Sequence, residues 1–522
     1  MRRREFKRCT PEEVGIPSEA IEQLLDALEY GGFTQMHGLM IMRHGKVCAE
    51  GWWSPFAPGL EHCDHSLSKT YTATAIGIAE REGLLRLGDR VIDIFPDRAP
   101  QDPSERLGRL TVRDLLVMGS GMDDEQPGYP ADWLDVFLRT PLEVEPGKRW
   151  RYDSHVTTVL SAIVERVSGQ DMLEYLTPRL FDRIGIDASR VMCNRAADGV
   201  CIGGSGMFTT TEDNLRLMKL YLDGGVFDGE RILSEEFVRD ATSRQMDTAE
   251  AHAHTPWIYD NCVGYGYQIW MCRWPGAYRA DGAYGQFSIV VPDLDLIVSI
   301  NEDGYLGEHM SHNELSLLKG KLGEEAPVHG PQATLNAVFE HLVPQVREEI
   351  LPPSGHSARL AARMARLCVP RPASGSLLAH RPHRFDCALE PEEGRISFGL
   401  LFGMEKNRRN YGGAERIRIR IEGGDCEIAF VEAGREQRFN ADLLGGRRTG
   451  ALHYDALLET RIETAGWWEA ENRFCLSLLW TQTELENRFA FTFDGSKVTV
   501  EEWIAGGVFG PMGRVQARYR LV

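Results

Sequence analysis

The residues of this chain whose types and spacing best suit chemistry are a serine and a lysine three positions apart, Ser66 and Lys69. Segment 70–80 has no proline and carries apolar residues close to helical spacing, so we expect a buried helix that begins at or near Ser66. Residues three apart share one helix face, and the first turn favours negative charge. Ser66 and Lys69 can therefore touch, and an amine that helps to remove the hydroxyl proton would make the serine a nucleophile.

Ser-x-x-Lys is a weak pattern on its own, because about one match is expected by chance in a chain of this length. A second match, Ser316 with Lys319, is present. For an isolated match the simpler interpretation is a helix-capping serine followed by a surface lysine. The surrounding sequence has to decide between these interpretations.

A tyrosine and a serine two positions apart, Tyr152 and Ser154, lie at an expected helix start after Pro146-Gly147. A phenol held among cations can ionise below its usual pKa and take a proton from a serine, while a nearby hydroxyl can hydrogen-bond a lysine. The structural alternative is a core tyrosine with an N-capping serine.

A glycine-rich segment, 278–286, precedes a strand expected from Phe287 and contains Asp281, Gly282, Ala283 and Gln286. Glycine lets a backbone approach a substrate closely, so the Ala283 N–H could join that of Ser66 as an oxyanion hole. The same glycines could simply mark a hairpin or a bulge.

The composition narrows the class of protein. A net charge of −19 over 522 residues argues against nucleic-acid or membrane partners, and the 43% hydrophobic content suffices for a sizeable core. The eleven cysteines are scattered without a Cys-x-x-Cys pair, which favours a reducing compartment. Because the basic residues 1–8 lead into Cys9-Thr10-Pro11 rather than an apolar run, we expect a cytoplasmic protein.

The expected elements suggest how these residues are positioned. They indicate an α/β (α+β) domain spanning 1–346. In chain order we expect a helix from Pro17-Ser18, a hairpin of 38–42 with 47–51, helices to Leu222, strands at 264–270, 287–291 and 296–300, and a helix over 334–343. The domain would hold an antiparallel sheet flanked by helices and assembled from both ends, with an inserted helical subdomain and the active cleft at the seam.

The rest of the chain differs in residue composition and in the spacing of its apolar residues. Residues 347–382 are rich in proline, arginine and serine and are expected to be a linker. Alternating segments such as 416–421, and a hairpin of 489–493 with 498–500 joined at Asp494-Gly495, indicate an all-β barrel or sandwich domain over 383–522.

Together with segments 10–15, 110–116 and 203–210, these motifs resemble the serine β-lactamase, penicillin-binding protein and esterase superfamily, nearest to its class C and aminohexanoate-oligomer-hydrolase branch. The resemblance covers residues 8 to 346 and leaves out Ser316 and Lys319. It implies that Ser66 is acylated, that Lys69 is its hydrogen-bonding activator, and that Tyr152 transfers protons in both half reactions. Ser154 stands where many relatives have asparagine.

One departure from the family pattern concerns the substrate. Relatives that take β-lactams usually have lysine or histidine where this chain has Ala280, and that cation meets the substrate carboxylate. Here Asp281 follows, and it would repel a carboxylate. The departure argues against antibiotic defence and favours an amine or a neutral ester or amide.

The sequence therefore predicts a serine hydrolase that cleaves a small ester or amide through an acyl-enzyme, with Ser154, Asp281, Gly282, Ala283 and Gln286 binding the substrate. No cofactor or metal is expected, because His65, His155, His252 and His254 show no four-ligand spacing. A catalytically silent binder of a ligand or partner is the alternative from another class, and a genuine β-lactamase or D-aminopeptidase the alternative among enzymes. A homo-oligomer is left open.

Overall fold

The structure, a computed structural model, describes residues 5–30, 34–123, 128–253, 259–304, 330–369, 384–398, 412–453, 459–483, 485–504 and 515–522. The chain divides into two compact units. The first comprises Met1–Gly304 and Pro327–Leu367, and the second includes Cys368–Val522. The predicted boundaries at 346 and 382 stay predictions.

The described part of the first unit is built on a seven-stranded sheet in the order β1-β3-β2-β12-β11-β10-β9. Its strands are β1 (Lys7–Arg8), β2 (Gln35–Arg43), β3 (Lys46–Trp52), β9 (Trp270–Met271), β10 (Tyr278–Gly282), β11 (Gln286–Val291) and β12 (Leu296–Asp303). All neighbouring strands are antiparallel except β1 and β3. The pairing of β2 with β12, with Met42 opposite Ile297, confirms that both ends of the domain build one sheet.

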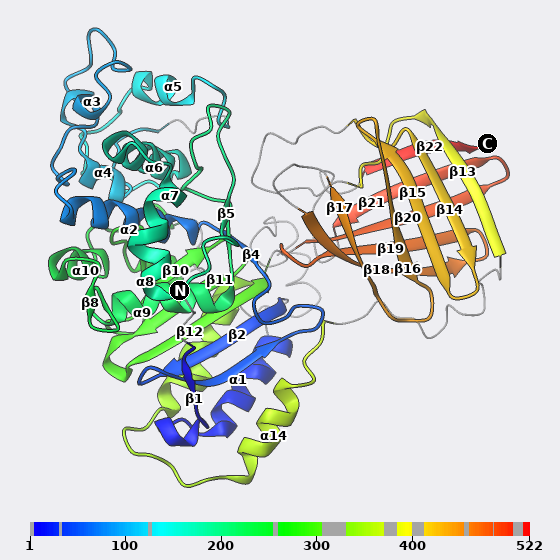
Figure 1. Cartoon of the computed structure of the whole chain (residues 1–522), viewed down its shortest axis with the longest axis horizontal. Helices are drawn as coiled ribbons and strands as arrows, with labels where there is room; N and C mark the ends of the chain where they lie inside the picture. The colour runs from blue at the N-terminus through cyan, green and yellow to red at the C-terminus, as the bar shows by residue number, and fades with distance from the viewer. Residues whose placement is uncertain are drawn as a thin grey trace. The chain divides into compact units, whose positions relative to one another are not determined.

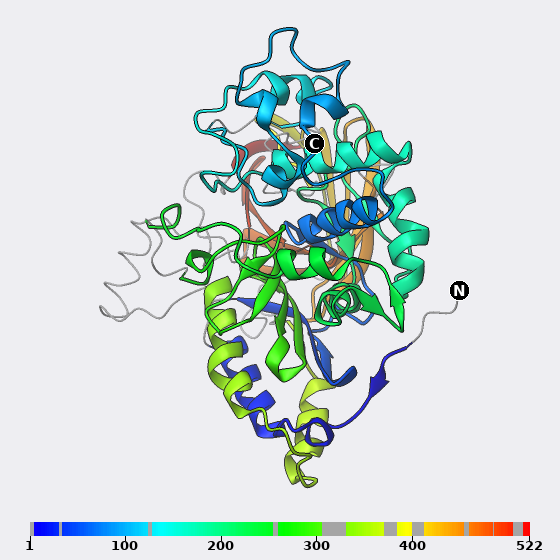
Figure 2. The ribbon, with the colours of Figure 1, turned by 90° about the vertical axis from the view of Figure 1, so that its left-hand side faces the viewer.

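Helices cover both faces of this sheet (Figure 1). On one face lie α1 (Ser18–Tyr30), α13 (Pro331–Ala337) and α14 (Gly355–Met364), and α9 (Thr211–Leu222) packs on the other. The inserted helical subdomain centres on α2 (Ser68–Arg81) and α6 (Ser154–Ser168), which contact one another. It also contains α3 (Val91–Ile94), α4 (Val112–Leu116), α5 (Trp133–Arg139), α7 (Met172–Leu176), α8 (Asp182–Ile184) and α10 (Glu235–Ala241). Figure 2 shows α2 above the strands and α1 with α14 below them.

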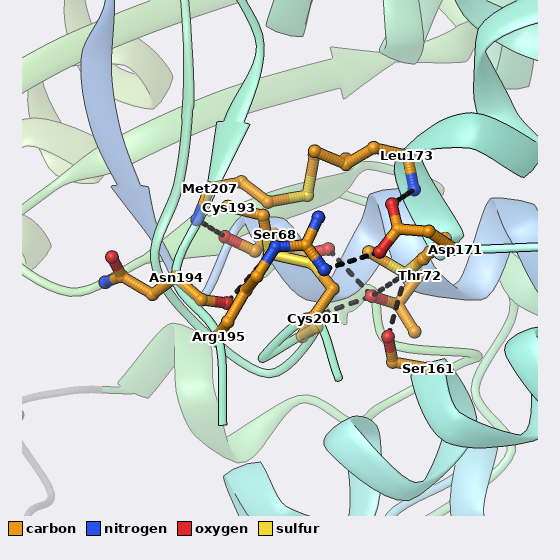
Figure 3. The surroundings of a disulfide bond; sticks show 12 residues. Ser68, Thr72, Ser161, Asp171, Leu173, Cys193, Asn194, Arg195, Cys201 and Met207 are labelled. Atoms are coloured by element: carbon orange, nitrogen blue, oxygen red, sulfur yellow. Dashed lines mark hydrogen bonds and ion pairs between the residues drawn. A yellow bond between two sulfur atoms is a disulfide. The ribbon is translucent and has the colours of Figure 1, made fainter. Parts of the chain in front are cut away.

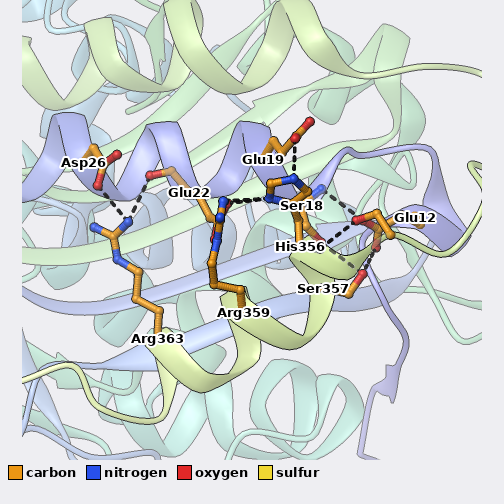
Figure 4. A network of polar contacts seen from close by, with 10 residues as sticks. Glu12, Ser18, Glu19, Glu22, Asp26, His356, Ser357, Arg359 and Arg363 are labelled. Atoms are coloured by element: carbon orange, nitrogen blue, oxygen red, sulfur yellow. Dashed lines mark hydrogen bonds and ion pairs between the residues drawn. The ribbon is translucent and has the colours of Figure 1, made fainter.

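Charged side chains hold α14 against α1 (Figure 4). Arg359 Nε donates to Glu22 Oε1 at 2.5 Å, and Arg363 Nη2 donates to Glu29 Oε2 at 2.6 Å. Buried Glu12 accepts a hydrogen bond from Ser357 Oγ at 2.7 Å. Part of the predicted linker is thus a helix packed on the first unit.

The second unit contains a closed β-barrel. Its described strands run in the order β16-β15-β14-β13-β22-β21-β20-β19-β18-β17, and a further pairing of β16 with β18 closes the ring. The strands are β13 (Arg384–Glu393), β14 (Arg416–Glu422), β15 (Asp425–Glu432), β16 (Arg435–Asp442), β17 (Arg448–His453), β18 (Glu459–Ala470), β19 (Arg473–Trp480), β20 (Glu486–Asp494), β21 (Lys497–Ile504) and β22 (Val515–Leu521). In β14, Ile417, Ile419 and Ile421 are buried between exposed arginines, as the alternating pattern predicts.

One expected strand is shorter than predicted. Of segment 264–270, only Trp270 belongs to a strand, β9. Gly264 has φ +143° and Gln268 has φ +57°, and neither conformation continues a strand. The Gln268 side chain instead donates to the carbonyls of Leu115 and Leu116, so this segment ties the sheet to α4.

In the described parts of the chain, no helix has both the length and the apolar composition needed to cross a membrane.

Two buried histidines pair beside β4 (His62–His65), the strand that leads to Ser66. His37 Nδ1 lies 2.9 Å from His62 Nε2, and His62 Nδ1 lies 3.1 Å from the Cys63 carbonyl oxygen. Because a carbonyl only accepts, His62 Nδ1 carries the proton of that contact, and in a neutral pair His62 Nε2 accepts from His37 Nδ1. Burial, and the charge of His62 when protonated, hold the pKa of His37 well below its usual value.

We expect the free energy of unfolding to fall as the pH drops below about 6.5, because the unfolded chain then protonates His37 before the folded chain does. For this one group the loss approaches about 2 kcal/mol at pH 5. Denaturant titrations between pH 7.5 and 5 should show a smaller loss for His37→Asn, whose amide can still donate to His62. His44→Asn, at an exposed histidine, should follow the unsubstituted protein. Identical pH dependence of the His37→Asn variant and the unsubstituted protein would contradict this account.

Candidate active site

Ser66 lies in the turn that joins β4 to α2. Leu67 N donates to the Asp64 carbonyl at 3.0 Å, and Lys69 N donates to the Ser66 carbonyl at 2.9 Å, so the turn continues directly into the helix. His65 has φ +46°, a left-handed conformation that turns the chain sharply just before the serine. The expected helix start near Ser66 therefore matches the described structure.

The Lys69 side chain joins three segments that are distant in sequence. Its Nζ lies 2.9 Å from Ser66 Oγ and 3.0 Å from Ser154 Oγ, and it also donates to the Gly204 carbonyl. Lys69 is 1% exposed. Burial lowers its pKa to about 7, although the charges of Asp153 and Asp281 act in the opposite direction. Burial therefore favours the neutral amine at a pH well below that at which an exposed lysine loses its proton.

The start of α6 leaves the Ser154 hydroxyl available to this lysine. Asp153 caps the helix, because its Oδ1 accepts from His155 N at 2.8 Å. Ser154 is therefore not the N-cap residue, and its Oγ accepts a hydrogen bond from Lys69.

Tyr152 lies beside the same lysine. The centre of its ring is 4.7 Å from Lys69 Nζ. The ring stacks on Trp270 with centroids 5.7 Å apart and meets Tyr265 edge-on at 6.4 Å. An aromatic wall thus positions the phenol, and Ser66, Lys69, Tyr152 and Ser154 come together as the sequence predicts.

The β10–β11 hairpin passes close to the serine turn. A Cβ on Gly282 would lie only 2.1 Å from the Asp64 carbonyl oxygen, so only glycine allows this approach. The rings of His65 and Tyr284 meet edge-on at 4.9 Å. Ala283, between Gly282 and Tyr284, therefore lies beside the turn that carries Ser66.

The other two predicted substrate contacts have strong partners within the protein. Asp281 Oδ2 accepts from Nε of fully buried Arg279 at 2.6 Å, while burial raises the pKa of its carboxyl. Gln286 is 0% exposed and donates to the Glu302 carbonyl at 2.7 Å. Gln286 thus holds the hairpin to β12 (Leu296–Asp303), and any part it plays in substrate binding is indirect.

Two further residues shape this site: Gly204, which the sequence does not single out, and Asp64, whose carboxylate the sequence suggests only as a group that could set local pKa values. Gly204 supplies a carbonyl to Lys69 and belongs to segment 203–210, which contributes to the family resemblance. Asp64 is fully buried and accepts from Thr209 Oγ1 and Asn214 Nδ2, both at 2.7 Å. A backbone carbonyl has no sequence signature, and the partners of a buried aspartate appear only once the chain is folded.

Other candidates take no part in this cluster. In the described ranges, no group of three or more His, Cys, Asp and Glu residues could hold a metal ion. His155 Nε2 bonds the Gly128 carbonyl at 2.9 Å. Ser316, Lys319 and His254 lie outside the described residues.

Comparison with known proteins adds independent observations. The sequence model of the family named Beta-lactamase matches residues 21–319. A 6-aminohexanoate-dimer hydrolase from Paenarthrobacter ureafaciens is 28% identical over 270 residues, which cover 46% of this chain and 67% of that protein. Penicillin-binding protein 4 from Amycolatopsis lactamdurans is 28% identical over 305 residues, which cover 51% of this chain and 77% of that protein. An octameric penicillin-binding protein homologue from Pyrococcus abyssi aligns over 96% of this chain and 98% of its own at 14% identity, with a TM-score of 0.43.

Gly204→Ala tests how closely the segment that bonds Lys69 is packed. Its Cβ would lie 2.2 Å from the Ser154 carbonyl oxygen, so the segment or the start of α6 has to move. We expect a loss of about 1–3 kcal/mol in stability, the usual cost of overpacking, measured by thermal or denaturant unfolding. Gly88→Ala is the matched control, since nothing lies within 4 Å of its added Cβ. Equal stability of the two variants would contradict the described packing.

Proposed function

Because the chain belongs to the beta-lactamase family of serine hydrolases, we propose that Ser66, Lys69 and Tyr152 cleave a small ester or amide through an acyl-enzyme intermediate. The observation that carries this proposal is the buried Lys69 amine, whose Nζ lies 2.9 Å from Ser66 Oγ and whose pKa is about 7. A lysine that serves only as a surface charge has no reason to be buried against a serine hydroxyl.

The contacts of Lys69 define its proposed part in acylation. The Gly204 carbonyl can only accept, so one N–H of the amine points toward it, and a second can point toward Ser154 Oγ. A neutral amine then has its lone pair for the Ser66 hydroxyl proton. Neutral Lys69 thereby helps the Ser66 oxygen to attack the substrate carbonyl.

The remaining steps use groups next to this pair. Negative charge that develops on the substrate oxygen would be received by the N–H groups of Ser66 and Ala283. Tyr152 would give its phenol proton to the departing alcohol or amine and take back the serine proton from Lys69. In deacylation, water attacks the acyl carbon, its proton returns through Tyr152, and Ser66 Oγ is released with its proton restored.

The residues at the edge of the site favour substrates without a carboxylate. Ala280 is buried and uncharged where a cation would be needed, and Asp281 is paired with Arg279 at 2.6 Å. The Arg279 cation is already bound by Asp281, so a carboxylate on the substrate would meet the Asp281 oxygens instead of a cation. We therefore propose neutral esters or amides ahead of β-lactams.

The proposed compartment is the cytoplasm. The cysteines that form no disulfide support this compartment, because thiols stay reduced in the cytoplasm. The Cys193–Cys201 disulfide is the observation against it.

A fluorophosphonate probe tests the nucleophile directly. Ser66 Oγ should displace fluoride and form a phosphonate ester, because neutral Lys69 assists removal of its proton. Mass spectrometry of peptides should locate the adduct on Ser66, and Ser66→Ala should abolish both labelling and hydrolysis of chromogenic esters. Ser316→Ala, which removes the second Ser-x-x-Lys match, is the control and should retain both. Hydrolysis by folded Ser66→Ala would end this assignment, and an unlabelled protein that binds acyl ligands would indicate a silent binder.

The pH profile of kcat/KM tests the lysine. As the pH rises through about 7, Lys69 loses its proton, so kcat/KM should rise with an apparent pKa of about 7. Asp153→Asn can still cap α6 but removes a charge that raises the pKa of Lys69, so the rise should move to lower pH. Asp293→Asn, at the other end of β11, should leave it in place.

Lys69→Arg, whose guanidinium stays charged, should reduce kcat/KM by roughly 100- to 10,000-fold at every pH. A profile without a rise near pH 7 in the unsubstituted protein, or an active Lys69→Arg variant, would count against this role for Lys69.

A further inference from the structure

A disulfide closes the connection between two short strands next to the site (Figure 3). Strand β5 (Met192–Cys193) pairs with β6 (Met207–Thr209), so that Cys193 lies opposite Met207. The chain between them makes a loop, and Cys201 in that loop is bonded to Cys193. The scattered cysteines of the sequence did not predict this pair.

The residues that follow the disulfide are fastened to the first turns of α2. Thr72 Oγ1 donates to the Gly203 carbonyl at 3.0 Å, and Lys69 Nζ donates to the Gly204 carbonyl. At the end of the loop, Met207 N donates to Ser68 Oγ at 3.0 Å. The loop thus supplies one of the acceptors that fix the orientation of the Lys69 amine.

This fastening leaves little room for displacement. A Cβ on Gly203 would lie 2.4 Å from Thr72 Oγ1, and one on Gly204 would lie 2.2 Å from the Ser154 carbonyl oxygen. Gly203 N also donates to the Cys201 carbonyl at 2.8 Å. A displacement of Cys201 would therefore move Gly203, and with it the Gly204 carbonyl that Lys69 contacts.

Other contacts preserve the fold around the loop when the disulfide is broken. Arg195 Nη1 donates to Asp171 Oδ2 at 2.5 Å, and Ile202 N donates to the Asn194 carbonyl at 2.8 Å. The pairing of β5 with β6 is also independent of the sulfur bond. Cleavage of the disulfide should therefore loosen residues 201–204 and leave the fold intact.

We propose that Cys193 and Cys201 are positioning residues of the hydrolase: their disulfide holds the Gly204 carbonyl against Lys69, and its reduction lowers turnover reversibly. This inference rests on the proposed function, because it assumes that Lys69 assists Ser66. It makes the enzyme responsive to the thiol redox state of its surroundings.

The redox step balances with a dithiol as reductant. A thiolate of the dithiol attacks Sγ of Cys193, which is 8% exposed whereas Cys201 is fully buried. The S–S bond breaks, Cys201 leaves as a thiolate and takes up a proton, and a mixed disulfide remains on Cys193. The second thiol of the reductant then displaces Cys193, so the protein gains two thiols and the reductant becomes a cyclic disulfide.

A loosened loop should affect the rate in a pH-dependent way. Loss of one hydrogen bond to the catalytic amine predicts a kcat about tenfold lower at pH 7. Water that enters beside Lys69 weakens the burial that lowers its pKa, so the pKa should move upward and the loss should be smaller at pH 9. A disulfide that served stability alone would not shift the pH profile.

The test compares ester hydrolysis by the full chain before and after treatment with dithiothreitol, with mass spectrometry to confirm two added hydrogens at Cys193 and Cys201. We expect kcat to fall about tenfold at pH 7, to fall less at pH 9, and to recover after reoxidation. Thermal unfolding should show the reduced protein still folded at the assay temperature.

Two variants separate this effect from others. Cys193→Ser/Cys201→Ser should match the reduced protein and ignore dithiothreitol, whereas Cys368→Ser, at an exposed thiol, should behave like the unsubstituted protein. Unchanged kcat after verified reduction would overturn the proposal, as would a loss that is equal at both pH values or that merely follows unfolding. If the oxidised protein neither hydrolyses esters nor takes the fluorophosphonate, the proposed function fails first and this inference fails with it.

Discussion

The burial of one amine is the constraint on which the rest of this structure depends. Lys69 is 1% exposed, and burial lowers its pKa from 10.5 to about 7. Each unit of pKa corresponds to about 1.4 kcal/mol. Near neutral pH the burial of this lysine therefore lowers the free energy of unfolding by roughly several kcal/mol. The surrounding core has to offset that cost. A buried amine of this kind is typical of a site whose chemistry uses it, since a leucine there would carry no such penalty.

Several parts of the first unit hold that amine in place. Every residue of α2 from Ser68 to Ala79 is buried, so the helix that carries Lys69 is fixed on all sides. The sheet brings the β10–β11 hairpin against the serine turn, and α6 brings Ser154. Segment 203–204 adds a carbonyl from a fourth part of the chain. These segments are distant from one another in sequence. The close approach of Gly282 fixes the hairpin, the Asp153 cap fixes the start of α6, and the Cys193–Cys201 disulfide lies next to segment 203–204.

Much of this arrangement could be predicted from residue types and periodicity. The helix after Ser66, the hairpin of β2 and β3, the strands β11 and β12 and the alternating β14 all have local signals, because apolar spacing or turn residues specify them directly. The meeting of Ser66, Lys69, Tyr152 and Ser154 was anticipated from motif order and family likeness. The parts that escaped prediction have no local signal. The Gly204 carbonyl is a backbone atom, Arg279 acts through a partner two residues away, and the Cys193–Cys201 bond needs β5 and β6 to be folded first. Segment 264–270 looked like a strand because its glycines and tyrosines alternate, but the left-handed backbone at Gln268 serves the contact with α4 instead.

The central claim is that Ser66, neutral Lys69 and the hairpin at Ala283 form one catalytic centre. A crystal structure of the protein after reaction with a phosphonate ester tests this most directly, because the tetrahedral phosphorus resembles the geometry of the intermediate. The account predicts phosphorus bonded to Ser66 Oγ, one phosphonyl oxygen within hydrogen-bond distance of the Ser66 and Ala283 N–H groups, and Lys69 Nζ still in contact with Ser66 Oγ and the Gly204 carbonyl. A phosphonyl oxygen that points to solvent, with Lys69 turned away from the serine, would contradict it.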